Sequence, residues 1–245
     1  MTFLALLAAL AVAASSGTGN PAVEALRASV PLPETRINPA PPKVKGPSFP
    51  IATVREGHRI ALHASPGGRV ITRVGDRTDF GSMRVFWIEQ VRRGWFGVPA
   101  PELPDGELAW IRDDRFALYL SQTHFWIDAN VSRQILELHY GDRLLDRFRI
   151  TVGSPSSPTP PGDYSVTDGL VGKGLGPWYG CCALALSGHQ PNLPAGWIGG
   201  NRMAIHGTPG SIGGATSHGC LRASDPNMIS LFARVPLGAP VFIHS

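Results

Sequence analysis

Glycine and proline interrupt this chain so often that only short segments of regular structure fit between them. The 245 residues include 29 glycines and 23 prolines. Between them lie short runs rich in β-branched and aromatic side chains, which are typical of strands bounded by turns. One segment has a helical pattern, with Asp225 as the expected N-cap and Pro226 at the first helical position. The sequence therefore predicts a mainly β protein with one short helix near its C-terminal end.

The first residues have the character of an export signal. An apolar run from Phe3 to Ala14 contains the small-residue pattern that export peptidases favour, and it is short for a membrane span. We therefore expect residues 1–17 to be a secretory signal. No Lys or Arg precedes the run. An uncleaved anchor, a misassigned start codon and an N-terminal core helix are the alternatives that the sequence leaves open.

Two further regions follow before the C-terminal half. Residues 18–50 are rich in proline and poor in aromatic residues, which favours an extended linker. Residues 51–113 contain short strand-like runs, and their spacing predicts a small antiparallel barrel. The expected strands are 58–64, 69–74, 83–91, 94–98 and 108–111. Within them, Gly94–Val98 and Pro104–Ile111 resemble bacterial Src-homology-type barrels that accompany cell-wall enzymes.

A second pattern begins at Phe116. Leu136, Leu138 and Tyr140 alternate with polar residues before a Gly-Asp turn at 141–142, and a similar alternation resumes after it. This is the pattern of a half-buried β-hairpin. Residues 239–243 read as a final strand. The chain therefore divides into a barrel over 51–113 and a second β domain over 116–244.

The densest chemistry lies in the segment Ser217–Arg222, with His206 upstream in a glycine-rich run. A cysteine thiol is mostly protonated at neutral pH, so a nucleophilic Cys220 needs an imidazole or another cationic neighbour to favour the thiolate. Glycine allows tight turns and close approach of a substrate to the backbone. We therefore interpret this region as an active-site loop.

Three sequence blocks together resemble the catalytic domain of the L,D-transpeptidases, which crosslink bacterial cell walls. The blocks are Thr151–Gly153 with Thr159–Tyr164, then Ala204–Thr208, then Ser217–Arg222. The resemblance covers residues from about 116 to 244, and the last block is its most specific part. It implies a β-sandwich catalytic domain with one short helix after the nucleophile.

The resemblance also implies roles for individual residues. Cys220 would be the nucleophile and His206 its base, with the Gly207 carbonyl orienting the imidazole in place of a carboxylate. His218 would line the pocket and support the thiolate. The residues that the resemblance assigns to substrate binding are Arg222, Gly219, Ser217 and Thr208. Among these, Arg222 and the main-chain N–H groups of Gly219 and Cys220 would hold a substrate carboxylate or the developing oxyanion.

The implied reaction is acyl transfer from a peptidoglycan stem tetrapeptide. The thiolate would form a thioester at the third residue and release D-alanine, and an amine of a neighbouring stem would complete the crosslink. Water as the acceptor would make the protein an L,D-carboxypeptidase instead. The resemblance implies no cofactor and no metal, a monomer acting on peptidoglycan stem peptides, and a role in cell-wall biogenesis and cell shape at the cell wall or in the periplasm.

Several competing interpretations start from the same residues. His206, His218 and Cys220 could bind zinc, but no fourth ligand at a suitable spacing completes such a site. The protein could be a non-catalytic peptidoglycan-binding module, or Cys220 could be a buried structural thiol. Cys181 and Cys182 suit small buried positions, and a redox bond from either to Cys220 is a hypothesis prompted by the odd number of cysteines.

Charge gives weaker information. The net charge of +4 suits a protein that works beside an anionic polymer such as a cell wall. No nucleic-acid motif gathers the positive charge, so we expect no nucleic-acid partner. The arginines are instead spread along strand-like segments, which favours solvated strand faces. They are Arg55, Arg59, Arg69, Arg73, Arg84, Arg92, Arg93, Arg143, Arg147 and Arg149.

Overall fold

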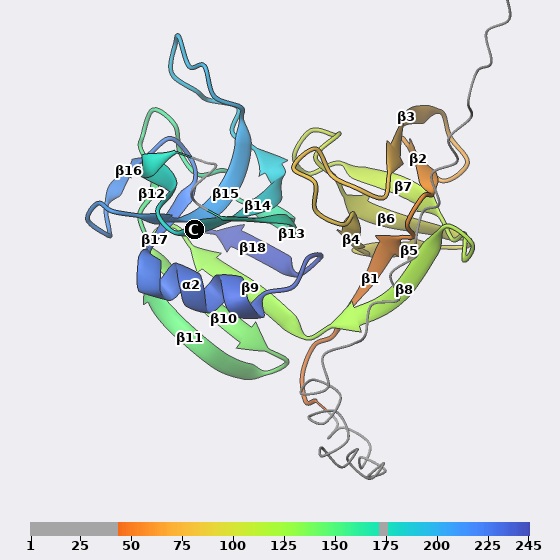
Figure 1. Cartoon of the computed structure of the whole chain (residues 1–245), viewed down its shortest axis with the longest axis horizontal. Helices are drawn as coiled ribbons and strands as arrows, with labels where there is room; N and C mark the ends of the chain where they lie inside the picture. Colours follow the sequence, from red (N-terminus) through yellow and green to blue (C-terminus); the bar gives the residue numbers. More distant parts are fainter. Residues whose placement is uncertain (1–43, 172–175) are drawn as a thin grey trace, which may run out of the picture. The chain divides into compact units, whose positions relative to one another are not determined.

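Strands dominate the part of the chain that the computed structural model describes, residues 44–171 and 176–245 (Figure 1). Contacts group Val44–Ser245 into one unit. The predicted signal at 1–17 and most of the predicted linker at 18–50 lie outside the described residues. No helix in the described part of the chain has the length and hydropathy needed to cross a membrane.

The N-terminal strands form two sheets, one of three strands in the order β4-β1-β8 and one of five in the order β3-β2-β7-β6-β5. Their bounds are β1 (Phe49–Val54), β2 (Arg59–His63), β3 (Val70–Gly75), β4 (Val85–Trp87), β5 (Gln90–Arg92), β6 (Trp95–Pro99), β7 (Leu108–Arg112) and β8 (Leu118–Thr123). Leu62, Val98 and Ile111 are fully buried in the core that these strands share. The Src-homology type of this barrel and the domain boundaries stay predictions. β8, which the sequence places in the second domain, pairs with β1.

The single strand expected over 83–91 is wrong, because the chain changes partners there. β4 pairs with β1, whereas β5 pairs with β6. Between these strands the amide of Ile88 donates to the carbonyl of Pro50, and the amide of Glu89 donates to that of Gly97. The switch from one sheet to the other breaks the run into two short strands.

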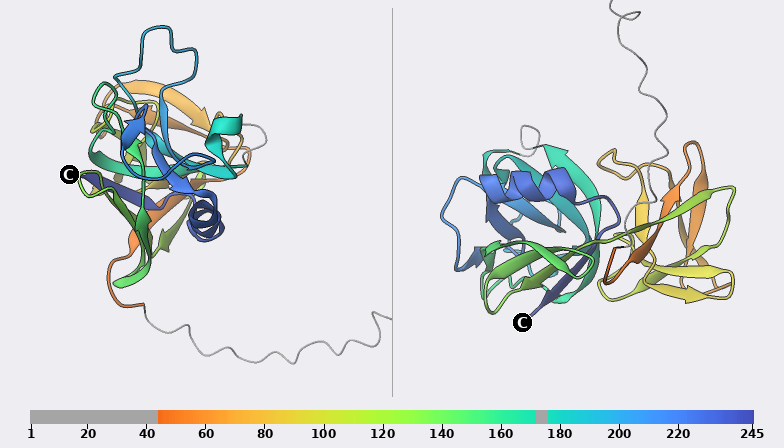
Figure 2. Two further views of the ribbon diagram at one scale, coloured as in Figure 1. Left: turned by 90° about the vertical axis from the view of Figure 1, so that its left-hand side faces the viewer. Right: turned by 90° about the horizontal axis from the view of Figure 1, so that it is seen from below.

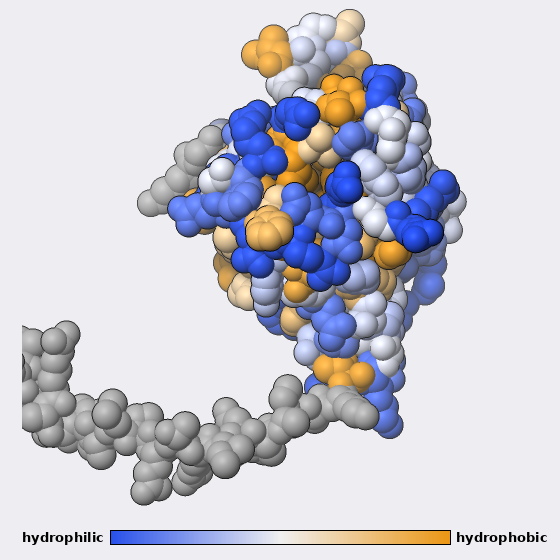
Figure 3. Space-filling view, turned by 90° about the vertical axis from the view of Figure 1, so that its right-hand side faces the viewer, coloured by the Kyte–Doolittle hydropathy of each residue, from blue (hydrophilic) through white to orange (hydrophobic). Residues whose placement is uncertain are grey.

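The arginines expected on solvated strand faces are exposed with one exception. On the face of the molecule in Figure 3, hydrophilic residues lie between scattered apolar ones. Arg84 is the exception, with 6% of its surface exposed. Its guanidinium forms an ion pair of 2.7 Å with Glu102 and donates to the carbonyls of Gly75 and Arg77. The expectation was wrong for this residue because these partners satisfy a buried charge.

An eight-stranded mixed sheet, in the order β11-β10-β9-β18-β13-β14-β15-β17, forms the C-terminal half (Figures 1 and 2). Its strands are β9 (Phe125–Asn130), β10 (Ile135–Tyr140), β11 (Arg143–Arg149), β13 (Gly162–Val171), β14 (Cys182–His189), β15 (Arg202–Thr208), β17 (Leu221–Ser224) and β18 (Pro240–His244). A short parallel pair, β12 (Val152–Gly153) and β16 (Ala215–Ser217), lies beside it, and a 3-10 turn, η2 (Pro177–Tyr179), precedes β14.

β13 connects the two halves of this sheet. Its first residues pair with β18 and its later residues pair with β14. Leu138 and Ile127 from one half and Leu186 and Ile205 from the other are fully buried in a single core. This arrangement confirms the predicted fold class, a mainly β chain with a sandwich-type second domain and one α-helix among its described residues.

The predicted hairpin and the predicted last strand are both confirmed. β10 and β11 pair antiparallel across a turn at Gly141, which has a φ of 60°. Leu136 and Leu138 are fully buried, whereas Arg147 on β11 is exposed. β18 pairs parallel with β9, which places the end of the chain inside the sheet.

The helix α2 (Asp225–Arg234) begins one residue earlier than the sequence predicted, with Ser224 as its N-cap. Ser224 has extended backbone angles because it ends β17. The Asp225 carboxylate accepts the amide of Cys181 at 3.1 Å, so it ties the helix to the start of β14. α2 packs against β14, β15 and β17 (Figure 2).

We expect Leu231→Ala to destabilise the protein by about 2–5 kcal/mol, because the Leu231 side chain is fully buried and its removal leaves a cavity. Denaturant unfolding measures the change in the free energy of unfolding. Ile229→Ala on the same helix is the matched control, since Ile229 is 57% exposed. Equal losses for the two variants would contradict the packing of α2 described above.

Candidate active site

Parallel pairing of β15 with β17 positions Cys220. Ile205 lies opposite Leu221 and His206 lies opposite Arg222, so the residue before β17, Cys220, lies opposite Ala204. The Ala204 amide hydrogen-bonds to the thiol. Because side chains alternate along a strand, Ala204 and His206 share one face of β15. The register therefore brings the thiol and the imidazole to the same side of the sheet, one pleat apart.

The turn before Cys220 needs glycine and a hydroxyl residue. Gly219 has a φ of 109°, and a Cβ at this position would lie 2.0 Å from the side-chain nitrogen of Gln190. Ser217 Oγ accepts the Gly219 amide at 3.1 Å and donates to the Cys220 carbonyl at 2.6 Å. Thr159 Oγ1 donates to the Gly219 carbonyl at 2.8 Å. These bonds connect the Thr-Pro-Pro-Gly block directly to the nucleophile turn.

The His206 ring is fixed in one tautomer. Its Nδ1 lies 2.6 Å from the Gly207 carbonyl, and a carbonyl can only accept, so Nδ1 carries the hydrogen. The ring is 4% exposed. The pKa of His206 is lowered to about 4, mainly by burial; the Gly207 hydrogen bond opposes this shift, and the charge of Arg222 contributes to it. At neutral pH the imidazole is therefore uncharged, with Nε2 free to accept a proton.

The Cys220 thiol is protonated as well. Burial raises its pKa above the ordinary value, while the Ala204 amide and Arg222 act in the opposite direction. The resting pair is therefore neutral, which differs from the expectation that His206 holds a thiolate. Among the described residues, the hydrogen bond of this thiol is with Ala204 and none is formed with the imidazole. Deprotonation then has to accompany attack on a substrate.

Cys220 and His206 line one cavity of about 400 Å³. Of the eight residues that the sequence assigned to the site, five border it: Cys220, His206, His218, Arg222 and Thr208. The other three have supporting positions. Gly207 accepts the His206 ring hydrogen, as expected. Ser217 is fully buried and accepts the Gly219 amide, so both residues support the turn before Cys220, and their part in substrate binding stays a prediction.

The remaining walls come from residues that sequence reasoning did not assign to the site. They belong to η2, to the long β14–β15 connection that projects at the top of Figure 1, and to the first residue of β15. The Tyr179 ring lies 4.8 Å from the His206 ring, and the Trp197 ring lies 4.9 Å from that of His218. The other members are Trp178, Gln190, Leu193, Gly200, Asn201 and Arg202. The sequence signal that could have indicated these walls is the presence of tryptophans in connections rich in glycine and proline.

The charge of the cavity is positive. Its lining contains Arg202 and Arg222 beside two histidines, and no Asp or Glu residue among the described lining residues. Arg222 has a buried Nε without a hydrogen-bond partner in the described structure. A buried donor without a partner is costly unless a ligand satisfies it. The cavity therefore favours an anionic ligand beside the thiol.

The other cysteines lie apart from this chemistry. Cys182 is 4% exposed within the main core, which fits a small buried residue, and Cys181 contacts Asp225 at the start of α2. All three cysteines are free in the structure. Within residues 44–171 and 176–245, no three His, Cys, Asp or Glu side chains are grouped so that they could hold a metal ion.

Comparison with known proteins gives a family match over the C-terminal half of the chain. Residues 124–243 match the family model for the YkuD-type L,D-transpeptidase catalytic domain. A Bacillus licheniformis protein assigned as the L,D-transpeptidase YkuD is 32% identical over 119 residues, which are 48% of this chain and 64% of that protein. Its Bacillus subtilis counterpart is 30% identical over 122 residues, 49% of this chain and 66% of that protein. The chain thus spans just under two thirds of either relative.

Solved structures give a weaker likeness. An Enterococcus faecium L,D-transpeptidase is 21% identical, with a TM-score of 0.38 over 49% of each chain. L,D-transpeptidase 3 from Mycobacterium tuberculosis is 15% identical, with a TM-score of 0.41 over 56% of this chain and 74% of that one. Scores this low carry no argument about function.

We expect the alkylation rate of Cys220 by iodoacetamide to be still rising at pH 9. The reagent attacks the thiolate, and burial raises the pKa of this thiol above the ordinary 9.0. Peptide mass spectrometry follows Cys220 separately from the other two cysteines. A rate that levels off below pH 7 would instead indicate a resting thiolate–imidazolium pair.

Proposed function

Because residues 124–243 match the L,D-transpeptidase catalytic-domain family, we propose that this protein is a cysteine acyltransferase that crosslinks peptidoglycan stem peptides. The observation that carries the proposal is the Cys220–His206 arrangement. A neutral imidazole, oriented by the Gly207 carbonyl, borders the same cavity as the thiol. A general base of this kind activates a cysteine without a third acidic residue.

In the first step, His206 Nε2 takes the proton of Cys220 as the sulfur attacks the carbonyl of the third residue of a stem tetrapeptide. A neutral base is needed here, and the low pKa of His206 provides one throughout the physiological range. The imidazolium then gives its proton to the departing D-alanine amine. A thioester on Cys220 remains.

Charge complementarity supports a stem peptide as the donor. The terminal D-alanine of the donor carries a carboxylate, and the cavity offers Arg222 and Arg202 with no opposing carboxylate among the described lining residues. The unpartnered Nε of Arg222 is a suitable donor to such a carboxylate or to the developing oxyanion. The Gly219 amide is not available for this role, since Ser217 accepts it.

In the second step, an amine of a neighbouring stem attacks the thioester and His206 accepts its proton. The product is a crosslink between the third residues of two stems. This reaction places the protein at the cell wall or in the periplasm, in cell-wall biogenesis and the maintenance of cell shape. Water in place of the amine would give L,D-carboxypeptidase products from the same thioester.

We expect Cys220→Ala to abolish crosslinking of purified disaccharide tetrapeptides, and His206→Ala to slow it by about 10²–10⁴-fold. Mass spectrometry of the products separates crosslinked dimers from hydrolysed tripeptides. His58→Ala is the matched control, because His58 is an exposed histidine in the connection between β1 and β2 and borders no part of the cavity. Crosslinking at the wild-type rate in Cys220→Ala would refute the proposal.

We also expect a carbapenem to acylate Cys220, because its strained lactam presents an activated carbonyl and a carboxylate to the cationic cavity. The intact mass should rise by the mass of one carbapenem in the wild type, and should not change in Cys220→Ala. An adduct on Cys181 or Cys182 alone would contradict the assignment of Cys220 as the nucleophile.

A further inference from the structure

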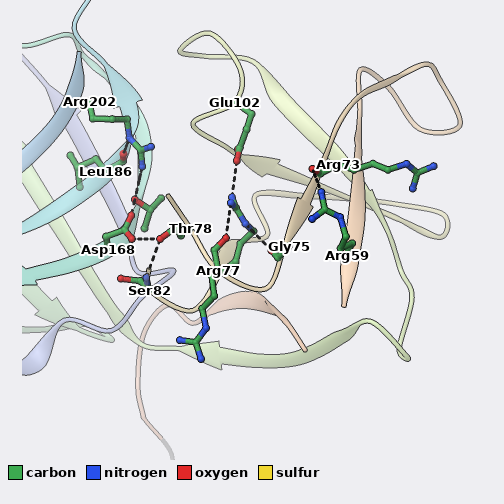
Figure 4. A network of polar contacts seen from close by, with 12 residues as sticks. Arg59, Arg73, Gly75, Arg77, Thr78, Ser82, Glu102, Asp168, Leu186 and Arg202 are labelled. Carbon is green, nitrogen blue, oxygen red and sulfur yellow. Dashed lines mark hydrogen bonds and ion pairs between the residues drawn. The ribbon is translucent and has the colours of Figure 1, made fainter. Parts of the chain in front are cut away.

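A turn of the N-terminal strands reaches across to the catalytic sheet. This turn, residues 76–82, is held by the Thr78 amide, which donates to the Ser82 carbonyl at 3.0 Å, and by the Ser82 amide, which donates to Thr78 Oγ1 at 3.1 Å. The same hydroxyl donates to a carboxylate oxygen of Asp168 in a short hydrogen bond (Figure 4). Thr78 therefore connects the N-terminal strands to β13.

Asp168 is a fully buried carboxylate with few partners. Thr78 satisfies its Oδ1, whereas Oδ2 has no hydrogen-bond partner in the described part of the chain and lies 3.9 Å from the Arg202 Nη2. A buried charge that loses one of its few partners is strongly destabilised. Asp168 therefore couples the position of Thr78 to that of Arg202.

Three contacts orient the Arg202 guanidinium. Its Nε donates to the Leu186 carbonyl at 2.9 Å (Figure 4). Its Nη2 donates to Thr167 Oγ1 at 2.7 Å. From the N-terminal turn, the Phe80 ring centroid lies 5.8 Å from the guanidinium carbon. The C-terminal sheet and the N-terminal turn together therefore determine where the Arg202 side chain lies.

Arg202 also belongs to the active-site cavity. It is the first residue of β15 and shares a strand face with Ala204 and His206, by the alternation of side chains along the strand. It borders the cavity that contains Cys220. A shift of Arg202 therefore changes a wall of the donor site without touching the thiol or the imidazole.

We propose that the N-terminal strands position the donor site through the chain of contacts Thr78–Asp168–Arg202, in which Thr78 and Asp168 are positioning residues and Arg202 lines the site. This inference rests on the proposed function. It assigns the N-terminal strands a direct part in substrate binding, in addition to any contact they make with the wall. Because Cys220 and His206 lie outside the contact chain, its loss should affect binding of the donor more than the chemical step.

The test uses Thr78→Val in the full chain, which removes the hydroxyl and keeps the shape of the side chain. We expect the KM for the donor tetrapeptide to rise by about two- to thirty-fold, the range of coupling found along such networks, with a much smaller change in kcat. Alkylation of Cys220 by iodoacetamide, which needs no donor site, should keep its wild-type rate. Thr78→Ser retains the hydroxyl and should retain the wild-type KM.

Two variants of the same strands serve as matched controls. Thr72→Val makes the same substitution on β3, away from the contact chain. Arg59→Gln removes an exposed arginine that donates to the Arg73 carbonyl. Both should keep the wild-type KM, and thermal unfolding checks that every variant is folded.

The double variant examines whether Thr78 acts through Arg202. Arg202→Gln alone should raise the KM, and Thr78→Val combined with Arg202→Gln should raise it little further, because the two residues belong to one chain of contacts. Arg202→Lys should not restore the KM, since an ammonium cannot reproduce the planar set of contacts. Fully additive effects of the two substitutions would overturn the inference.

The outcomes separate this inference from the proposed function. A wild-type protein that neither crosslinks stems nor reacts with a carbapenem would refute the function itself. An active wild type with an unchanged KM in folded Thr78→Val would overturn the inference alone. If Thr78→Val does not fold, Arg202→Gln decides, and an unchanged KM in that variant overturns the inference.

Discussion

The parallel pairing of β15 with β17 is the constraint on which the candidate active site depends. It places Cys220 opposite Ala204, one pleat from His206, and the turn before β17 can form only because Gly219 has no side chain. The hydroxyls of Ser217 and Thr159 then complete the hydrogen bonds of that turn. The three sequence blocks are thus parts of one structural unit, although they lie far apart along the chain.

The sequence predicts those strands that have one buried face and one exposed face. β10 alternates between buried and partly exposed positions, so its period of two is enough to identify the hairpin from the amino-acid sequence. β14 and most of β15 are buried on both faces and show no such alternation. They are therefore not predicted as strands, even though β15 carries His206. The predicted helix start is wrong by one residue because the Asp225 carboxylate has a tertiary partner, the Cys181 amide.

The proposed catalytic pair, Cys220 and His206, could be selected from the sequence because both residues lie in short, chemically distinctive motifs. The walls of the cavity could not, since they come from η2 and the β14–β15 connection, where tertiary contacts decide which residues face the thiol. Gln190 is an example. It is 3% exposed, and its side-chain nitrogen donates to the Pro158 carbonyl at 2.7 Å. The two residues are far apart in the sequence, so no local sequence pattern predicts this contact. Ser217 is the opposite example. It belongs to a recognisable motif, but its hydroxyl stabilises the turn by donating to the Cys220 carbonyl and does not line the cavity.

The neutral resting state of Cys220 and His206 affects how fast the thiol is oxidised. Peroxides and disulfides consume cysteine through its anion, so a sulfur that keeps its proton until a substrate arrives reacts slowly with either oxidant. The burial that raises the pKa of Cys220 therefore also protects it from inactivation. For the exported enzyme proposed above, this slow reaction with oxidants would lengthen the time for which the thiol stays reduced.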